Sequence, residues 1–279
     1  MGGCSKRGVI GVVGGMGPLA GARLVELITR LTPALCDQDH RDVVLVSTPG
    51  RISDRTAFLL GHTDENPAAA VADCVQMLAR AGATCVGIAC NAAHAPPIWD
   101  AITDILARRR CDVELLHLVE ETAREVGARV PQGSTVGVLG TTGSIRSDVY
   151  GQLLRPAGFE VRYLDDLRQG EVHAAIYNEV DGLKSSAEVS ERVRELVKHA
   201  ARELIDNGAR CVVLGCTELP EALPFESLDG VPVIDPAVVM ARRLILRSAA
   251  GGAGPASPRR SVEPAGSVPR PPESPDDFR

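Results

Sequence analysis

The sequence predicts an α/β fold built from a duplicated unit, and three features carry this prediction. Strand-like runs alternate with amphipathic helical patterns along most of the 279 residues. The strand-like runs are apolar throughout, which is typical of parallel strands covered by helices on both faces of a sheet. Two pairs of motifs also recur at one constant spacing. We therefore predict an α/β protein with parallel sheets.

The predicted strands are short runs rich in Val, Ile and Leu, which is the pattern of buried parallel strands. In chain order they cover residues 8–13, 42–47, 84–89, 113–118, 134–140, 159–164, 210–215 and 231–236. The helical patterns between and after them include residues 19–31, 67–80, 189–206 and 237–247. This alternation is typical of βαβ units.

Residues that cap helices mark several of these boundaries. Asn66 and Pro67 form an N-cap and first-position pair at the start of one helical pattern. Gly82 and Gly208 stand where a glycine ends a helix in a left-handed conformation. Each of these two glycines is followed directly by a predicted strand.

The chain contains an internal repeat. The segment VIGVVGGMG (9–17) aligns with TVGVLGTTG (135–143), and GATCVGIACN (82–91) aligns with GARCVVLGCT (208–217). Both pairs share a spacing of 126 positions, which is hard to obtain by chance in two separated motifs. A third candidate pair, with a slightly shorter spacing of 118, is formed by residues 113–123 and 231–241. We interpret this pattern as a duplicated α/β unit.

Composition excludes several classes of function. The formal net charge is −6 and no basic stripe is present, which argues against binding to nucleic acid or to an anionic membrane surface. No apolar stretch approaches the roughly 20 residues of a membrane helix, and no secretory signal is apparent, so we expect a cytoplasmic protein. Residues 249–279 are rich in proline and poor in apolar side chains, and we predict a disordered tail there.

Eight cysteines occur without a C-x-x-C motif and without the Cys/His spacing of a zinc site. We expect free thiols and no metal site. Two of these cysteines, Cys90 and Cys216, end matched strands, and ligands of open parallel sheets bind at that end. Backbone N–H groups and the positive end of a following helix lower the pKa of a thiol there.

If the two halves face each other about a pseudo-two-fold axis, Cys90 and Cys216 lie on opposite sides of one cleft. One thiolate then removes a proton from a carbon atom while the other thiol delivers a proton to the opposite face. This chemistry inverts a stereocentre.

The alternative interpretation is that these cysteines only pack in the core, as most cysteines at strand ends do. Cys85 and Cys211 are matched in the same way, and we interpret them as core residues because they lie at the starts of the strands. Polar residues, which a strand end does not need for stability, favour catalysis at the other pair. They are Asn91, His94, Thr217 and Glu218.

Two further signals have alternative interpretations. Residues 15–20 fit G-x-G-x-x-A, but the second strand lacks the terminal acidic residue that would bind the ribose of NAD. We therefore do not predict a dinucleotide site. His94 follows Cys90 by four residues and either orients and protonates that thiol or is a structural histidine.

Five segments resemble the cofactor-independent aspartate/glutamate racemases, most closely aspartate racemase, and they occur in the order of that family. They are GVVGGMGPLAGARLVELI, DQDHRDVVLVSTPGRISDRTAFLLG, CNAAH, LGTTGSIRSDVY and GCTELP. The resemblance covers about residues 8–248. It implies two similar Rossmann-like domains with parallel sheets related by pseudo-two-fold symmetry, a homodimer, and neither pyridoxal phosphate nor any other cofactor or metal.

The resemblance also implies roles for individual residues. Cys90 and Cys216 match the two proton-transfer thiols. Arg55 and Lys184, which would otherwise be ordinary loop residues, match positions that hold the side-chain carboxylate in the aspartate branch. The positions around the α-carboxylate are matched by Asn91, Ala92, Ala93, Thr141, Thr142 and Thr217. Glu218 and His94 are candidates for catalytic support.

Two departures from the family pattern concern the substrate. The first cysteine motif usually reads Cys-Asn-Thr-Ala-His, and here Ala92 replaces the threonine and removes a hydroxyl donor. Residues 47–49 read STP where asparagines are common in relatives. Neither change touches the two thiols, so both bear on substrate and rate rather than on proton transfer.

The sequence and the resemblance thus predict a racemase that interconverts L- and D-aspartate or glutamate by two-thiol proton transfer, with an amino acid as its small-molecule substrate. We expect a first domain of residues 1–114 and 225–248, a second of residues 115–224, and the tail. The alternatives are an enzyme of the same fold acting on a different carboxylate, and a non-catalytic binding homologue.

Overall fold

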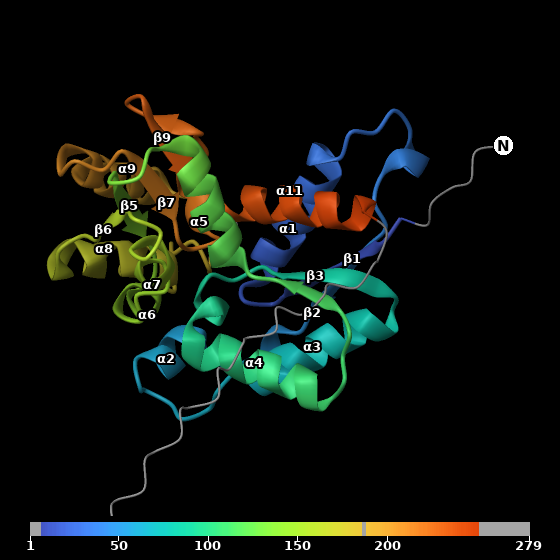
Figure 1. Cartoon of the computed structure of the whole chain (residues 1–279). Coiled ribbons are helices and arrows are strands. Elements are labelled where there is room, and N and C mark those ends of the chain that lie inside the picture. Colours follow the sequence, from blue (N-terminus) through green and yellow to red (C-terminus); the bar gives the residue numbers. More distant parts are fainter. Residues whose placement is uncertain (1–6, 186–187, 251–279) are drawn as a thin grey trace, which may run out of the picture.

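Two parallel-dominated sheets organise the protein, which a computed structural model describes over residues 7–185 and 188–250 (Figure 1). The first sheet has the order β2-β1-β3-β4, and the second has the order β6-β5-β7-β9-β8. Neighbouring strands are parallel except for β8 and β9. The predicted α/β class is confirmed. The part of the predicted tail from residue 251 onward lies outside the described residues.

The strands are β1 (Val9–Gly14), β2 (Val43–Ser47), β3 (Ala83–Ile88), β4 (Glu114–Leu116), β5 (Thr135–Leu139), β6 (Glu160–Arg162), β7 (Cys211–Leu214), β8 (Ser227–Leu228) and β9 (Val231–Ile234). The α-helices are α1 (Pro18–Leu31), α2 (Arg55–Leu59), α3 (Ala68–Arg80), α4 (Pro96–Arg108), α5 (Leu118–Arg129), α6 (Thr142–Arg146), α7 (Gly151–Leu154), α8 (Asp166–Tyr177), α9 (Glu191–Asp206), α10 (Leu219–Ala222) and α11 (Pro236–Ala249). Short 3-10 turns are η1 (Asp37–Asp39), η2 (Pro49–Arg51) and η3 (Ala92–His94).

Each of the eight predicted strands coincides with a strand of the structure, whereas β8 was not predicted because it is only two residues long. The two predicted glycine caps are present, but Pro67 rather than Asn66 is the N-cap of α3. The Asn66 side chain accepts a hydrogen bond from the Ala68 N–H at 2.9 Å, so α3 begins one residue later than predicted. Gly82 and Gly208 both have φ of +94°, the left-handed conformation that ends a helix.

The two sheets repeat each other in register. Ile10 of β1 lies opposite Cys85 of β3, and their counterparts 126 positions later, Val136 and Cys211, lie opposite each other in β5 and β7. The third candidate pair of segments follows the same pattern, because β4 and β9 occupy the same place beside β3 and β7. The internal repeat is therefore a structural duplication.

The end of the chain differs from the sequence-based domain division. The division assigned residues 225–248 to the first domain, but β9 (Val231–Ile234) pairs with β7 of the second sheet. The matching edge of the first sheet, beside β3, is already occupied by β4. Only α11 crosses, and its Met240 and Leu244 share a core cluster with Ile10 of β1. A helix also crosses in the other direction. It is α5, which follows β4 of the first sheet and packs its Val126 with Val136 of the second sheet.

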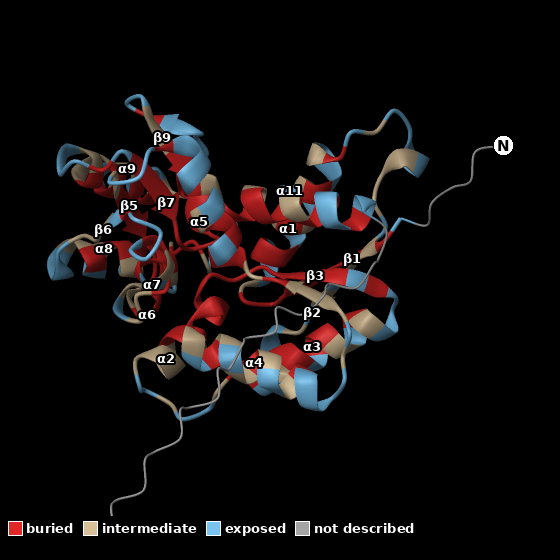
Figure 2. Ribbon diagram, in the orientation of Figure 1, coloured by how far each residue is buried: buried red, intermediate tan, exposed pale blue. Residues whose placement is uncertain are grey.

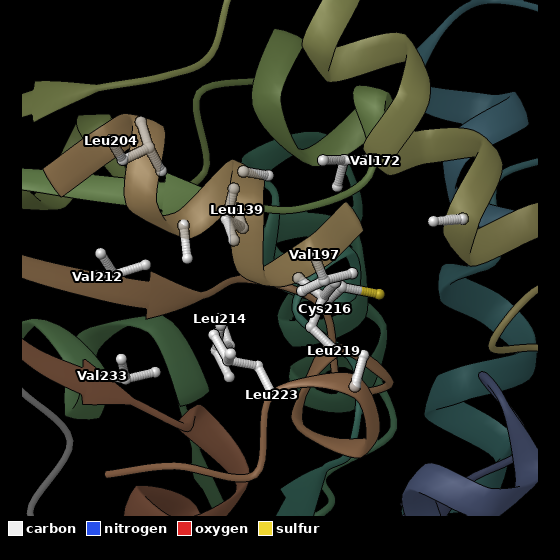
Figure 3. Packing of buried hydrophobic residues seen from close by; sticks show 14 of the residues in the cluster. Leu139, Val172, Val197, Leu204, Val212, Leu214, Cys216, Leu219, Leu223 and Val233 are labelled. Atoms are coloured by element: carbon white, nitrogen blue, oxygen red, sulfur yellow. The ribbon is translucent and has the colours of Figure 1, made fainter. Parts of the chain in front are cut away.

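Figure 1 shows the result of this exchange, with α11 beside α1 and α5 between the two halves. Buried residues concentrate on the strands and on the inward faces of the helices (Figure 2). Figure 3 shows the core of the second half, where the Cys216 sulfur lies at the edge of the cluster and points away from the Leu and Val side chains. None of the helices in the described part of the chain is long and apolar enough to cross a membrane.

Candidate active site

A small, partly open cavity lies between the two halves, where the chain leaves the carboxyl ends of β1, β3, β5 and β7. Its volume is about 20 Å³, which is room for about one water molecule. Residues from both halves line it, namely Met16, Arg55, Thr56, Cys90, Asn91, Ala92, Thr141, Ser144, Tyr177, Lys184, Gly215, Cys216, Thr217 and Glu218. A substrate larger than water requires the two halves or their side chains to separate first.

The two matched cysteines both line this cavity. Cys90 follows β3 and Cys216 follows β7, and their exposed fractions are nearly equal, at 5% and 6%. The other matched pair, Cys85 and Cys211, lies within the strands and is buried in the core as predicted. Burial raises the pKa of Cys85 to about 11 and that of Cys211 to about 12, so both thiols stay protonated near neutral pH.

Glu218 connects Cys216 to Lys184. The Cys216 thiol donates a hydrogen bond to Glu218 Oε2 at 3.0 Å, and Lys184 Nζ donates to Oε1 at 2.6 Å. Burial acts to raise the pKa of Glu218, but the Lys184 ammonium and the hydrogen bonds to the carboxylate outweigh it and lower that pKa. Burial and then the Glu218 charge raise the pKa of Cys216 well above its ordinary value.

Arg55 supplies a buried cation on the other side of the cavity. Its Nη1 donates to the Ser53 carbonyl oxygen at 3.1 Å, and its guanidinium interacts with the Cys90 thiol. Burial acts to lower the Arg55 pKa, but interactions with Cys90 and Asp54 outweigh it, so the side chain stays charged. Its Nε is buried without a hydrogen-bond partner among the described residues.

Asn91 presents a second buried donor. The Tyr150 hydroxyl donates to Asn91 Oδ1 at 2.5 Å and so fixes the orientation of the amide. The Nδ2 group then has no hydrogen-bond partner within the described chain. Buried donors are nearly always paired in folded proteins. Arg55 Nε and Asn91 Nδ2 are therefore suited to hydrogen-bond an anionic ligand such as a carboxylate.

Comparison with known proteins assigns the chain to a family. The sequence profile of the Asp/Glu/Hydantoin racemase family matches residues 13–244. The chain belongs to this racemase family. The broad specificity amino-acid racemase RacX of Bacillus subtilis is 26% identical over 242 residues, covering 85% of this chain and 96% of that protein.

Solved structures of racemases share the fold. The aspartate racemase of Picrophilus torridus superposes with a TM-score of 0.72 at 26% identity, over 86% of this chain and 94% of its own. An aspartate racemase homologue from Pyrococcus horikoshii OT3 has a TM-score of 0.63 at 24% identity, over 87% and 99% of the two chains, and supports the fold alone. The family and fold expected from the sequence are confirmed.

Three residues predicted for the site of this racemase do not line the cavity. Ala93 is fully buried in the core of the first half, and the Thr142 N–H donates to His173 Nδ1 at 3.3 Å. His94 turns away from the thiol, and its ring nitrogen Nδ1 lies 2.8 Å from the Cys90 carbonyl oxygen. The ring packs against Trp99 and His117, and this packing favours the interpretation of His94 as a structural histidine.

Several residues of the cavity were not predicted from the sequence. Thr56 and Ser144 lie inside the segments that resemble the family, directly beside or close to predicted residues, so those segments contained a signal for them. Tyr177 ends α8 and has no local signal, because only the packing of the two halves brings it to the cavity. Met16, Gly215 and the supporting Tyr150 were also missed.

No group of three or more His, Cys, Asp or Glu side chains in residues 7–185 and 188–250 is arranged to hold a metal ion. The chemistry available in the cavity is that of two thiols, one carboxylate, two cations and a set of hydrogen-bond donors. Such a set can move protons and stabilise negative charge.

Proposed function

We propose that this chain is a cofactor-independent racemase that interconverts the L- and D-forms of an acidic amino acid, aspartate first, by proton transfer at Cα between Cys90 and Cys216. One observation carries the proposal. The two thiols come from matched strands of opposite halves, and both line one buried cavity between those halves.

The chemistry of the step fits the residues present. One thiolate takes the Cα proton and becomes a thiol, and the electron pair of the broken C–H bond moves into the carboxylate to give an enolate-like dianion. The other thiol then gives its proton to the opposite face of Cα and becomes a thiolate. Donors aimed at the carboxylate stabilise this developing charge, and Asn91 Nδ2 is buried and unpaired within the described chain.

A second carboxylate is the group that the charged side chains favour. Arg55 is buried and protonated, and its free Nε can donate a charge-assisted hydrogen bond. Lys184 provides a second positive charge next to the cavity, although Glu218 already accepts a hydrogen bond from it. We infer that Arg55 holds the side-chain carboxylate and that Lys184 assists.

A broader choice of amino acids is the second candidate function. Lys184 is paired with Glu218, whereas Arg55 forms no such ion pair with a carboxylate of the cavity. Ala92 also lines the cavity, and its side chain is smaller than the threonine that relatives carry at this position. The relative RacX carries the name of a broad specificity amino-acid racemase. Both observations favour testing neutral and basic amino acids beside the two acidic ones.

The test is direct conversion without added cofactor. The purified protein is incubated with single enantiomers of aspartate, glutamate and a panel of other amino acids, and both enantiomers are quantified by chiral chromatography. We expect conversion of aspartate that is lost in Cys90→Ala and in Cys216→Ala but kept in Cys36→Ala, which changes an exposed cysteine. Binding of aspartate without conversion would support the non-catalytic alternative instead.

We further propose that the protein acts in the cytoplasm as a homodimer, as the resemblance to the family implies. Light scattering coupled to size-exclusion chromatography measures the mass in solution directly. A mass near twice 29.4 kDa supports the dimer, and a mass near 29.4 kDa contradicts it.

A further inference from the structure

We propose that the two thiols are inequivalent in the free protein, because Glu218 accepts a hydrogen bond from the Cys216 thiol and holds it as the acid, whereas Cys90 shares the cavity with the Arg55 cation and acts first as the base. The role in turnover rests on the proposed racemase function. The inequivalence itself is a property of the resting protein and can be measured without a substrate.

The hydrogen bonds around Glu218 require a proton on Cys216. Glu218 Oε1 accepts from Lys184 Nζ and from the Gly17 N–H, at 2.6 and 3.1 Å. Glu218 Oε2 accepts from the Cys216 thiol and from the Thr217 hydroxyl, at 3.0 and 3.2 Å. Every partner is a donor, which is the environment of an ionised carboxylate. Cys216 can be one of these donors only while it carries its proton.

The charged side chains that act on Cys90 are cations, in contrast to the Glu218 carboxylate beside Cys216. The Arg55 guanidinium interacts with this thiol, and the Lys184 ammonium also acts on it electrostatically. Glu218 is the one acidic residue among the described residues that line the cavity, and its hydrogen bond goes to Cys216. A nearby cation stabilises a thiolate, whereas a nearby carboxylate destabilises it.

The two phenols and the imidazole near the thiols are neutral. Burial raises the pKa of Tyr150 and of Tyr177, so both phenols keep their protons. His94 packs behind Cys90, and burial followed by His117 lowers its pKa well below the ordinary value, so the imidazole is uncharged. Asp54 lies behind Arg55 and accepts hydrogen bonds from the Ala57 N–H and the Tyr177 hydroxyl.

The inequivalence means that the free enzyme starts each reaction with the proton on Cys216. After Cys90 has taken the Cα proton and Cys216 has given up its own, a Cys216 thiolate stands beside the Glu218 carboxylate, and repulsion replaces their hydrogen bond. The resting form returns when Cys216 regains a proton and Cys90 releases the proton that it took from Cα. Because the two enantiomers have equal free energy, kcat/KM must be equal for the two directions of the reaction. We expect the inequivalent thiols to make kcat different for the L- and D-substrates, with KM different by the same factor.

Alkylation of single cysteines tests the inference. Iodoacetamide reacts with thiolates, and peptide mass spectrometry over a series of pH values gives the rate at each cysteine. Because Cys90 and Cys216 are almost equally exposed, a difference in rate reports ionisation rather than access. We expect Cys90 to react at least about tenfold faster than Cys216 near neutral pH. The core thiols Cys85 and Cys211 serve as unreactive internal references.

Variants of Glu218 identify the cause. Glu218→Gln removes the repelling charge and frees Lys184, so we expect the alkylation rate of Cys216 to rise at least about tenfold at neutral pH. Glu218→Asp keeps the carboxylate and should leave Cys216 slow. Lys184→Met leaves Glu218 without its cation and should slow Cys216 further. Circular dichroism confirms that each variant is folded.

The possible outcomes separate this inference from the proposed function. Faster reaction of Cys216 than of Cys90 in the unaltered protein overturns it, as does an unchanged Cys216 rate in folded Glu218→Gln. If Glu218→Gln does not fold, the order of reaction in the unaltered protein still decides. If the expected order is found but no amino acid is racemised, the inequivalence holds and the proposed function fails.

Discussion

At the scale of single residues, the cavity is defined by buried donors that lack partners in the described chain. Arg55 is only 8% exposed and Asn91 only 2%, yet each keeps one buried N–H donor unpaired there. An unpaired buried donor costs about 1–3 kcal/mol, and a ligand that accepts a hydrogen bond from it offsets that cost. The polar network around Asn91, including the Tyr150 hydroxyl, holds its donor in one direction.

Replacing Arg55 by lysine tests this role. Lysine keeps the charge but loses the planar guanidinium and its Nε donor, and a hydrogen bond to a charged group contributes about 1.5–3 kcal/mol. We expect the KM for aspartate to rise by about 10- to 100-fold. Steady-state kinetics measure the change, and Arg51→Lys, at an exposed position outside the cavity, is the matched control. Equal KM values in the two variants would remove Arg55 from the substrate site.

At the scale of elements, the site is closed by the contact of α2 with the second half. The Thr56 hydroxyl donates to Thr141 Oγ1 at 3.3 Å, and the Tyr177 hydroxyl donates to Asp54 and to Thr56 at 3.2 and 3.1 Å. Gly143 in α6 permits this approach, because a Cβ atom there would lie 2.9 Å from Thr56 Cα. The same contact positions Arg55, since Arg55 is the first residue of α2.

Gly143→Ala should push α2 away from α6. We expect a loss of about 1–3 kcal/mol in the free energy of unfolding, which is typical of overpacking, together with lower kcat/KM because Arg55 moves. Gly170→Ala is the control, because a Cβ there meets no atom within 4 Å and removing a mid-helix glycine stabilises by about 0.5–1 kcal/mol. Denaturant unfolding and activity assays measure both effects. Similar results for both alanines would contradict the close contact.

The N-terminus of α5 makes stability depend on pH. His117 Nδ1 accepts a hydrogen bond from the Glu120 N–H at 3.1 Å, and burial lowers the His117 pKa to about 4. The unfolded chain takes up this proton near pH 6.5 and the folded chain only near pH 4, so stability is complete above pH 6.5 and falls as the pH drops towards 4. Protonated Nδ1 also loses its role as a cap.

His117→Asn keeps a good N-cap residue and removes the titration. We expect the free energy of unfolding to fall less between pH 7 and pH 4.5 in this variant, while His94 still contributes to the remaining loss. Urea denaturation followed by circular dichroism at each pH provides the measurement. An equally steep fall in the variant would show that His117 is not responsible.

At the scale of the whole molecule, the exchange of α5 and α11 ties the halves into one unit. Each helix belongs by sequence to one repeat and packs against the sheet of the other, which places apolar side chains of both repeats in shared core clusters. The exchange also fixes the relative position of the halves, and so keeps Cys90 and Cys216 at one cavity. We therefore expect the halves to unfold together.

Leu244→Ala tests this cooperativity. Leu244 of α11 is fully buried against the first sheet, and such a truncation costs about 2–5 kcal/mol. The single tryptophan, Trp99, lies in α4 of the first half, so its fluorescence reports that half while circular dichroism reports the whole chain. Both probes should shift to the same lower denaturant midpoint. Separate midpoints would indicate that the halves unfold independently.

The sequence predicted the strands, the repeat and the two cysteines because these depend on local patterns. Cys90 and Cys216 follow strands whose apolar runs define their own ends. The crossing of α5 and α11 does not follow from local patterns, because a helical periodicity shows that a face is buried but not against which sheet. The division that assigns residues 115–224 to the second half and 225–248 to the first came from the resemblance to the family, and it misplaced the strands β8 and β9. The same limit explains why Tyr177 was missed and why the sequence left both interpretations of His94 open, since both depend on packing between distant segments.

The most direct test of two-thiol proton transfer follows deuterium from D₂O into aspartate at Cα. When one thiol removes a proton and the other delivers one from solvent, early product of the opposite configuration carries deuterium while the remaining substrate does not. We expect this asymmetry from either enantiomer, and its loss in Cys90→Ala and in Cys216→Ala. Deuterium appearing equally in both enantiomers from the start would indicate a single base and contradict the proposed two-thiol mechanism.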